Sequence, residues 1–486
     1  MIVRRALIHA LLISALASVG ASGQSTTPQY FKGSNAPRLP DYSAMRPANP
    51  DMAKIRAESE AERQRELDLL GIKTLYEPRN ARDPDAPNAA NYDPALANPY
   101  PRGSDVLREE GGAEVTSPAL WWAERRPEII KAAEDAIYGH MPDNLPGVTF
   151  TLTKTETTKI GGIAAVTQYY TGHVDNSSYP AISVDFPMSL TLPAKVKGKV
   201  PVIIEFGMGL HPASGFHELI PGYPLPPPLP TPDGHARLLQ SGWGYANFDP
   251  MAIQADNGAG LTKGIIGLVN KGQPRGLRDW GALRAWGWGA SQVLSFLQTQ
   301  AHVAGDEIGV TGHSRYGKGA FVAMIFDPRF AIGYISSSGA GGAKLMRRNF
   351  GETIADIAAA NEFHWTAINF LKYSAAPLSA NDLPVDADDL IALIAPRPVF
   401  ISGGNPTYGD AWVDAEGQFD AAVGAGPAYT LLGKKPLQTA TFPPLGTALI
   451  EGDIGFRQHD YGHSAGQEPN WPTFLQFAQK YLHIEQ

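Results

Sequence analysis

The sequence predicts an α/β protein in which a mainly parallel sheet is covered by helices on both faces. Short apolar runs alternate with longer helical patterns between residues 148 and 482. The run 200–206 (VPVIIEF) is almost continuously apolar, as in strands buried on both faces. Hydrophobic residues make up 43% and charged residues 18% of the 486 residues, which is an ordinary globular composition. Strands that alternate with helices predict a doubly wound sheet, a three-layer sandwich.

The first 23 residues have the form of a secretory signal peptide. Arg4 and Arg5 precede an apolar run over residues 6–19, and small residues follow at 21–23. That run is short for a membrane span, and no later segment is apolar enough to cross a bilayer. We therefore expect a secreted or periplasmic protein that is free of the membrane once the signal is cleaved near Gln24.

Residues 24–96 are predicted to form an N-terminal leader with one helix. Up to about residue 50 this leader is rich in Pro, Ser, Thr and Asn, a composition typical of flexible chain. Asp51 can cap a helix and Gly71 can end one, so residues 51–71 are expected to be helical. Since no internal repeat or clear linker divides the remainder, residues 97–486 are expected to form the main domain.

The main domain is predicted to begin with a helix over residues 121–138, because its apolar residues recur on one face. Pro127 lies inside that pattern, so the helix is expected to start at Arg126 or Pro127. A proline-rich loop at 221–232 is expected at a pocket rim, together with residues 254–271. The remaining predicted strands are 150–152, 166–170, 183–192, 200–206, 243–248, 308–310, 330–336 and 397–402, and the remaining predicted helices are 279–299, from 320 onward, 386–394 and 471–482.

The stretch 306–322 (DEIGVTGHSRYGKGAFV) carries the strongest chemical signal. Ser314 lies between Gly312 and Gly317 in a G-x-S-x-x-G pattern, after a buried strand and before a helix expected from Ala320. A serine on so sharp a turn exposes its hydroxyl, and the N–H groups of the next helix point to where an oxyanion would form. Ser314 is therefore the predicted nucleophile; the alternative is an incidental serine in a glycine-rich connection.

A nucleophilic serine needs a base and a carboxylate that orients the base. In α/β-hydrolases these follow the serine in the order acid, then histidine. Asp410 is the first carboxylate after a predicted strand, and Asp414 and Glu416 are alternatives. His463, in a loop before the last helix, is the preferred base, and His459 is the alternative. This order predicts an α/β-hydrolase fold.

The composition argues against several other classes of protein. The net charge of −8 gives no basic surface for nucleic acid. Cysteine is absent, which excludes disulfides, thiolate metal sites and a cysteine nucleophile.

At the residues around Ser314 the chain resembles the glucuronoyl esterases, carbohydrate esterase family 15. The family motif reads G-x-S-R-x-G-K, usually with cysteine at the position of His313. The similarity extends over roughly residues 97–482. The matching segments are 312–318, 338–342, 347–352 and 361–365, with an N-terminal signature at 121–129 and 138–139.

This resemblance implies roles for four further residues. Arg315 would stabilise the oxyanion with its guanidinium and its backbone N–H. Lys318 and Glu352 would bind the hydroxyls of the uronate ring. Trp412 would form part of the sugar pocket.

The resemblance also bears on the acid. Fungal members carry it at the position of Ser337, which has no carboxylate, whereas some bacterial relatives carry it where this chain has Asp410. It therefore implies a triad of Ser314, Asp410 and His463.

The activity that the resemblance implies is hydrolysis of esters between 4-O-methyl-glucuronate on xylan and lignin alcohols. The expected partner is this glucuronoxylan–lignin substrate, with no metal or organic cofactor, and the protein is expected to be a monomer. Two alternatives stay open, a broader carbohydrate esterase such as an acetyl-xylan esterase and a non-catalytic carbohydrate-binding protein.

Overall fold

The computed structural model describes residues 50–97, 105–207 and 233–483. The expected signal peptide, the leader up to residue 49 and the proline-rich loop at 221–232 lie outside these residues. In the described part of the chain, no helix is both long and apolar enough to cross a membrane.

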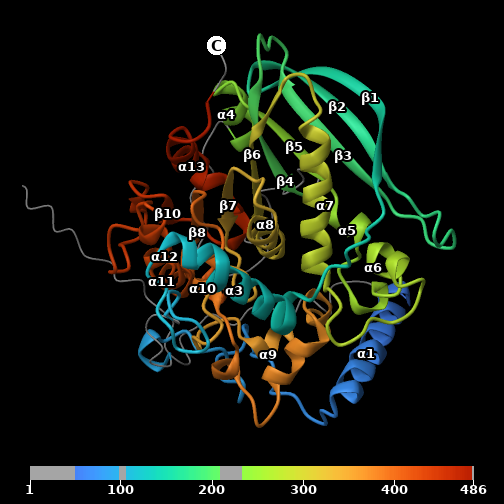
Figure 1. Cartoon of the computed structure of the whole chain (residues 1–486), viewed down its shortest axis with the longest axis vertical. Coiled ribbons are helices and arrows are strands. Elements are labelled where there is room, and N and C mark those ends of the chain that lie inside the picture. The colour runs from blue at the N-terminus through green and yellow to red at the C-terminus, as the bar shows by residue number, and fades with distance from the viewer. Residues whose placement is uncertain (1–49, 98–104, 208–232, 484–486) are drawn as a thin grey trace, which may run out of the picture.

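A ten-stranded sheet runs through the molecule in the order β1-β2-β3-β5-β4-β6-β7-β8-β10-β9 (Figure 1). Every neighbouring pair from β5 to β10 is parallel. The pairs from β1 to β5 and the pair β10–β9 are antiparallel. The strands are β1 (Val148–Ile160), β2 (Ile163–Val174), β3 (Asp185–Pro193), β4 (Val200–Phe206), β5 (Gly244–Phe248), β6 (Val303–His313), β7 (Ile332–Ser336), β8 (Val399–Gly403), β9 (Ala448–Leu449) and β10 (Ile454–Gln458).

The strand burial explains which parts of the sheet were predictable. Every residue of β4, β5, β7 and β8 is buried, as their apolar sequences predict. β1 is mostly exposed, because it is the edge strand. The strand β10 was missed, because the short sequence IGFRQ contains a glycine and two polar residues.

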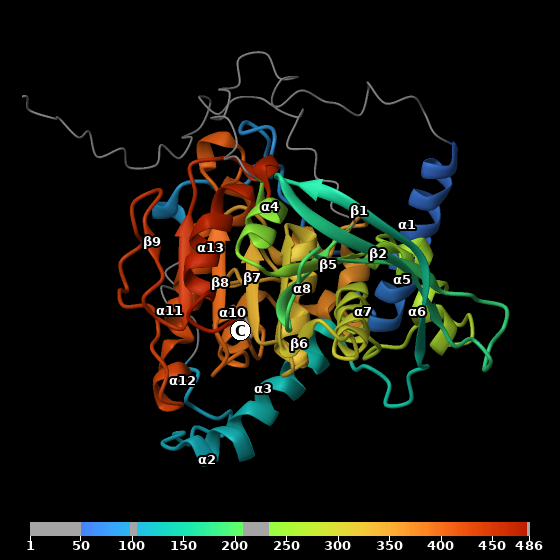
Figure 2. The ribbon, with the colours of Figure 1, turned by 90° about the horizontal axis from the view of Figure 1, so that it is seen from above.

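Two separate apolar layers cover the sheet, which makes the predicted three-layer sandwich. Along β4, Val202 and Ile204 face the larger core with α7 and α8, while Ile203 faces a smaller core with α4 and α13. Figure 2 shows α4 and α13 on one side of the central strands and α3 and α12 on the other. The α-helices are α1 (Pro50–Leu70), α2 (Pro118–Leu120), α3 (Arg126–Ala133), α4 (Gly234–Gln240), α5 (Pro250–Ile253), α6 (Gly264–Val269), α7 (Ala282–Leu297), α8 (Arg315–Phe326), α9 (Ile354–Ile357), α10 (Ala387–Ala392), α11 (Ala415–Gly424), α12 (Gly426–Leu431) and α13 (Trp471–Ala478).

The helix expected to start at Arg126 or Pro127 is α3, which begins at Arg126, but further helical turns precede it. Helical chain starts at Pro118, and Ser117 caps it by accepting the N–H of residue 120. A π-helical turn, η4 (Trp121–Arg125), precedes Pro127 and ends when the N–H of Arg126 reaches the carbonyl of Trp121. This wider turn admits proline, whose ring would clash with a carbonyl in a continuous α-helix.

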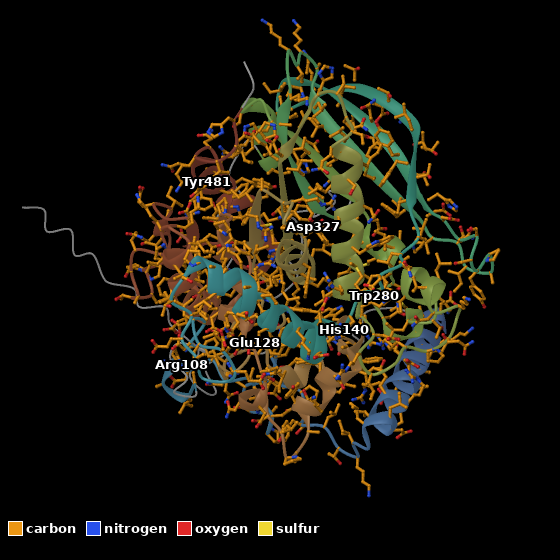
Figure 3. The ribbon with its side chains drawn as sticks, viewed as in Figure 1. Arg108, Glu128, His140, Trp280, Asp327 and Tyr481 are labelled. Carbon is orange, nitrogen blue, oxygen red and sulfur yellow. The ribbon has the colours of Figure 1, made fainter. Side chains whose placement is uncertain are left out.

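After this helix the chain pairs with the segment before α7. A second π turn, η5 (Glu134–Tyr138), ends at Gly139, whose φ of 81° suits glycine. The N–H of His140 donates to the carbonyl of Arg278 at 2.7 Å. Figure 3 shows His140 beside Trp280 at this junction.

The helix predicted from Ala320 begins earlier, at Arg315, directly after Ser314, so that prediction was wrong. The glycines of this first turn mark close packing rather than a longer loop. A Cβ on Gly317 would lie 2.7 Å from the carbonyl oxygen of Ser336, and one on Gly319 would lie 2.8 Å from the ring of Phe206. These glycines bring α8 close to the sheet.

Candidate active site

Ser314 occupies the sharp turn between β6 and α8. Its φ of 58° and ψ of −129° are strained values for a residue with a side chain. Its N–H donates to the carbonyl of Ser336 on β7 at 2.9 Å. A Cβ on Gly312 would lie 2.2 Å from the carbonyl oxygen of Tyr316, so the turn closes only with glycine there. The turn has the geometry of a nucleophile elbow.

The structure brings Ser314, His463 and Asp410 into one line of hydrogen bonds. Nε2 of His463 lies 3.0 Å from Oγ of Ser314, and Nδ1 lies 2.5 Å from Oδ1 of Asp410. A carboxylate can only accept, so Nδ1 carries the ring proton and Nε2 is left to accept the serine proton. The three side chains follow β6, β8 and β10, which run parallel in the order β6-β7-β8-β10, so their carboxyl ends lie along one edge of the sheet.

The carboxylate of Asp410 is buried and held on both oxygens. Oδ2 accepts the hydroxyl of Ser337 at 2.8 Å and also accepts the N–H of Gly404. Burial raises the pKa of Asp410, but the charge and hydrogen bond of His463 lower it by more, so the pKa lies below its ordinary value. Ser337, the position at which the resemblance implies an acid in fungal members, donates to the carboxylate of Asp410.

The alternative base, His459, is bound in a way that does not suit a base. Its Nδ1 accepts the N–H of Tyr461 at 3.1 Å, so its proton sits on Nε2. Burial lowers the pKa of His459 to about 4, which keeps the ring neutral. The geometry therefore favours His463.

The alternative acids, Asp414 and Glu416, are held by Arg348. Oδ2 of Asp414 lies 3.0 Å from Nε of Arg348, and Oε2 of Glu416 lies 2.7 Å from its Nη2. Asp414 also caps α11 by accepting the N–H of Gly417. The geometry therefore favours Asp410 over both alternatives.

Arg315 is held by a carboxylate that the sequence analysis missed. Its Nη1 lies 2.5 Å from Oδ2 of Asp256, and its side chain is 47% exposed. Oδ1 of Asp256 accepts Nε2 of His364 at 2.9 Å and Nε1 of Trp365 at 2.6 Å. Burial raises the pKa of Asp256, but its bond to His364 and the neighbouring positive charges lower it by more. No motif pointed to Asp256, whereas His364 and Trp365 lie in a segment matched by the family resemblance.

Lys318 lies beside Arg315 but is buried and fully bonded. Its Nζ donates to the carbonyls of Ser338 and Ala340, both at 2.7 Å, and to Oε2 of Glu352 at 2.8 Å. An ammonium has three protons, so a bond to a sugar hydroxyl would replace one of these three. The centroid of the Trp365 ring lies 5.6 Å from Cζ of Arg315 and 5.4 Å from Nζ of Lys318, so the ring contacts both cations.

Glu352 and Trp412, the other predicted sugar-binding residues, are joined through the backbone. The N–H of Glu352 donates to the carbonyl of Trp412 at 2.8 Å. Oε2 of Glu352 also accepts the N–H of Ala340 at 2.7 Å, and the carboxylate is buried. The side chain of Trp412 is half-buried. Both residues are thus tied to the loop that Lys318 holds.

Glu362 is a second glutamate, besides Glu352, whose charge interacts with Lys318 and Arg315, and the sequence analysis did not assign it to the site. Oε1 accepts Nδ2 of Asn361 at 3.1 Å. Burial, and then the charge of Glu352, raise the pKa of Glu362 to about 8, while Lys318 and Arg315 oppose the shift. This carboxyl is therefore mostly protonated at neutral pH.

His313, at the position where the resemblance implies a cysteine, lies beside His463. Its ring centroid lies 4.5 Å from that of His463. Its Nδ1 lies 3.1 Å from Oγ of Ser336. Within the described ranges, no group of three or more histidine, aspartate or glutamate residues is arranged to hold a metal ion.

Comparison with known proteins gives consistent relatives. A family model described as "Glucuronyl esterase, fungi" matches residues 230–433. The carbohydrate esterase MZ0003, from an unknown prokaryotic organism, is 30% identical over 85% of this chain and 97% of its own length. The 4-O-methyl-glucuronoyl methylesterase 1 of Wolfiporia cocos is 28% identical over 71% of this chain and 76% of its own.

Solved structures agree with these relatives. A CE15 glucuronoyl esterase from Teredinibacter turnerae is 40% identical, covers 87% of this chain and 99% of its own, and superposes with a TM-score of 0.79. A glucuronoyl esterase from Solibacter usitatus is 30% identical over 80% of this chain and 99% of its own, with a TM-score of 0.67. The resemblance inferred from the motif around Ser314 is confirmed. The chain belongs to carbohydrate esterase family 15, the glucuronoyl esterases, which are carboxylic ester hydrolases with an α/β-hydrolase fold.

Proposed function

We propose that the protein hydrolyses esters of 4-O-methyl-glucuronate, with Ser314, His463 and Asp410 as its catalytic triad. The observation that carries this proposal is the continuous line of hydrogen bonds from Ser314 through His463 to Asp410. Curated relatives are 4-O-methyl-glucuronoyl methylesterases, which supports a glucuronate ester as the substrate. In the plant cell wall such esters would join xylan side chains to lignin alcohols.

The reaction is acyl transfer through the serine. Oγ of Ser314 attacks the C6 carbonyl of the ester while its proton passes to Nε2 of His463. The negative charge of Asp410 then stabilises the imidazolium. His463 gives the proton to the leaving alcohol, which leaves the uronate as an ester of Ser314. A water molecule then attacks this acyl-enzyme while His463 takes a proton from the water. His463 passes that proton to Oγ of Ser314 as the uronic acid is released.

Two groups stabilise the oxyanion that forms on the C6 oxygen. The first are the backbone N–H groups at the start of α8, which begins directly after Ser314 and would donate to the oxyanion as helix N-termini do to anions. The guanidinium of Arg315 adds a positive charge, and its bond to Asp256 holds it in one orientation. Replacing Arg315 with alanine removes one such group and should lower kcat by roughly 10²–10³-fold.

Lys318, Glu352 and Trp412 form the sugar-recognition side of the proposed site. Glu352 offers a carboxylate to ring hydroxyls, and Lys318 holds that carboxylate and the 338–340 loop in place. A half-buried indole such as that of Trp412 offers an apolar face to a sugar ring.

The decisive experiment compares the wild type with Ser314→Ala on three kinds of ester. These are benzyl 4-O-methyl-glucuronate, a methyl galacturonate ester and acetylated xylan. We expect hydrolysis of the glucuronate ester and its loss in Ser314→Ala. Release mainly of acetate would favour a broader carbohydrate esterase, and folded protein that hydrolyses none of these esters would favour a carbohydrate-binding role.

We also propose that the mature chain is exported and works as a monomer. Residues 1–23 have the composition of a signal peptide. N-terminal sequencing of protein recovered outside the cytoplasm should give a start near Gln24. Light scattering should give the mass of one mature chain; the full chain is 52.1 kDa before cleavage.

A further inference from the structure

The helix α1 buries two polar side chains, and its apolar contacts with the core come from Leu67 and Leu70 at its end. Among its residues, those that are buried are Ser59, Glu66 and Leu67. An ordinary surface helix docks through a row of apolar side chains, so this pattern calls for another explanation. Removing a carboxylate from water costs a large desolvation free energy, so Glu66 needs a charged or hydrogen-bonding partner inside the protein.

Glu66 forms an ion pair with Arg275, and both side chains are fully buried. Nε of Arg275 lies 2.9 Å from Oε1 of Glu66, and Nη2 lies 3.3 Å from Oε2. Nη1 of Arg275 donates onward to the carbonyl of Thr366 at 2.5 Å, and Nη2 to that of Phe363 at 3.5 Å. The ion pair therefore ties α1 to the short helix η7 (Phe363–Trp365).

That short helix is the element that holds Asp256. His364 and Trp365, which lie between the two carbonyls bound by Arg275, both donate to Oδ1 of Asp256. The other oxygen of Asp256 holds the guanidinium of Arg315. A continuous series of ion pairs and hydrogen bonds thus runs from Glu66 in the leader to Arg315 beside the nucleophile.

A second contact reaches the same place from a different part of α1. Oγ of Ser59 accepts the N–H of Ala259 at 3.1 Å, three residues after Asp256. A Cβ on Gly258 would lie 3.2 Å from Cα of Ser59 and 2.4 Å from the ring of Phe363, so this loop is enclosed between α1 and η7. In Figures 1 and 2, α1 lies beside the region that leads into α6.

We propose that α1 is part of the support of the active site, and that Glu66 and Ser59 are positioning residues for the guanidinium of Arg315. This inference rests on the proposed role of Arg315 in oxyanion stabilisation. Asp256 has little freedom of its own, because α1 fixes both the loop that carries it and the helix that binds it. Since the oxyanion forms only in the transition state, an error in the position of Arg315 lowers kcat more than it raises KM.

The test is a double-mutant cycle on the full chain. Glu66→Gln and Ser59→Ala are each made in the wild type and in Arg315→Ala, with kcat normalised to the active sites that react with a serine-directed reagent. In the wild-type background, Glu66→Gln should lower kcat by about 10- to 100-fold and Ser59→Ala by about two- to tenfold. In the Arg315→Ala background both should change kcat less than about twofold, because there is no guanidinium left to position.

Matched controls separate positioning from stability. Glu60→Gln alters an exposed carboxylate of α1 that pairs with Arg63, and it should leave kcat unchanged. A purely structural role of Glu66 would lower the melting temperature and reduce kcat by the same factor in both backgrounds, which would overturn the proposal. If Glu66→Gln does not fold, the kcat values of Ser59→Ala in the two backgrounds decide between a positioning role and a structural role.

The outcomes also distinguish this proposal from the proposed function. Normal ester hydrolysis with equal losses in both backgrounds overturns the positioning role alone. If Arg315→Ala leaves kcat unchanged, the oxyanion role and the positioning role are both overturned. A wild type that hydrolyses no ester overturns the proposed function and everything built on it.

Discussion

The substitution Asp410→Asn tests the proposed triad most sharply, because the structure predicts which way the amide would turn. Oδ2 of Asp410 receives two donors, the hydroxyl of Ser337 and the N–H of Gly404, whereas Oδ1 receives one, Nδ1–H of His463. An asparagine has one oxygen, and it satisfies more donors when it faces Ser337 and Gly404. Its NH₂ group then faces His463.

That orientation forces the wrong tautomer on the base. An NH₂ group can only donate, so Nδ1 of His463 must accept, and the ring proton moves to Nε2. Nε2 faces Ser314 at 3.0 Å and can then no longer take its proton. A tautomer error of this kind costs roughly 10⁴-fold in kcat, or about 5.5 kcal/mol of transition-state stabilisation.

The assay is kcat on a benzyl glucuronate ester, with thermal unfolding measured alongside. Glu416→Gln is the matched control, since it neutralises a carboxylate of the same region that pairs with Arg348. The control should retain wild-type kcat. A nearly silent Asp410→Asn, combined with a severe Glu416→Gln or Asp414→Asn, would refute the assignment of the acid.

Three further predictions concern Gly312, Ser337 and Glu362. Gly312→Ala should abolish soluble active protein, because its Cβ would lie 2.2 Å from the carbonyl oxygen of Tyr316; a soluble, fully active variant would contradict the elbow geometry. Ser337→Ala removes one of the two donors to Oδ2 of Asp410 and should lower kcat by about 10- to 150-fold, since a hydrogen bond to a charged group contributes about 1.5–3 kcal/mol; an unchanged kcat would show that the N–H of residue 404 suffices. The pKa of Glu362 is raised from 4.5 to about 8, so the folded state keeps a proton that the unfolded chain releases. Its contribution to stability is therefore present at low pH and is lost as the pH rises from about 4.5 to about 8, with a slope of at most about 1.4 kcal/mol per pH unit. Urea unfolding across this range should show a shallower loss for Glu362→Gln than for the wild type, and parallel curves would contradict the raised pKa.

The turn at Ser314 and the buried strands could be predicted from the sequence, because each depends on residues that are neighbours along the chain. The glycines around Ser314 specify a sharp turn, and the apolar runs of β4 and β8 specify buried strands. The order of Ser314, Asp410 and His463 along the chain predicted the fold, since parallel strands bring such positions to one edge of a sheet. The family motif extended the prediction to Arg315.

Other features were local but misjudged, because two local rules competed. Glycine is unfavourable inside a helix, so Gly317 and Gly319 placed the predicted start of α8 too late in the chain. The close approach of Gly317 and Gly319 to the sheet makes both residues acceptable inside α8, and the π turn before Pro127 lets helical chain precede α3.

The tertiary structure alone decided which of several equivalent side chains meet. Asp410, Asp414 and Glu416 are all carboxylates within a few residues, and the sequence does not show that Arg348 holds the last two. The same is true of Asp256, which no motif marks but which binds Arg315. Hydrogen bonds and ion pairs between residues far apart in the chain depend on directions and distances of a few ångströms, and these exist only once the sheet has assembled. The sequence by itself determined the turn at Ser314, the order of the predicted triad residues along the chain and the family. Only the folded chain shows that Asp410 and His463 meet Ser314, and that Asp256 meets Arg315.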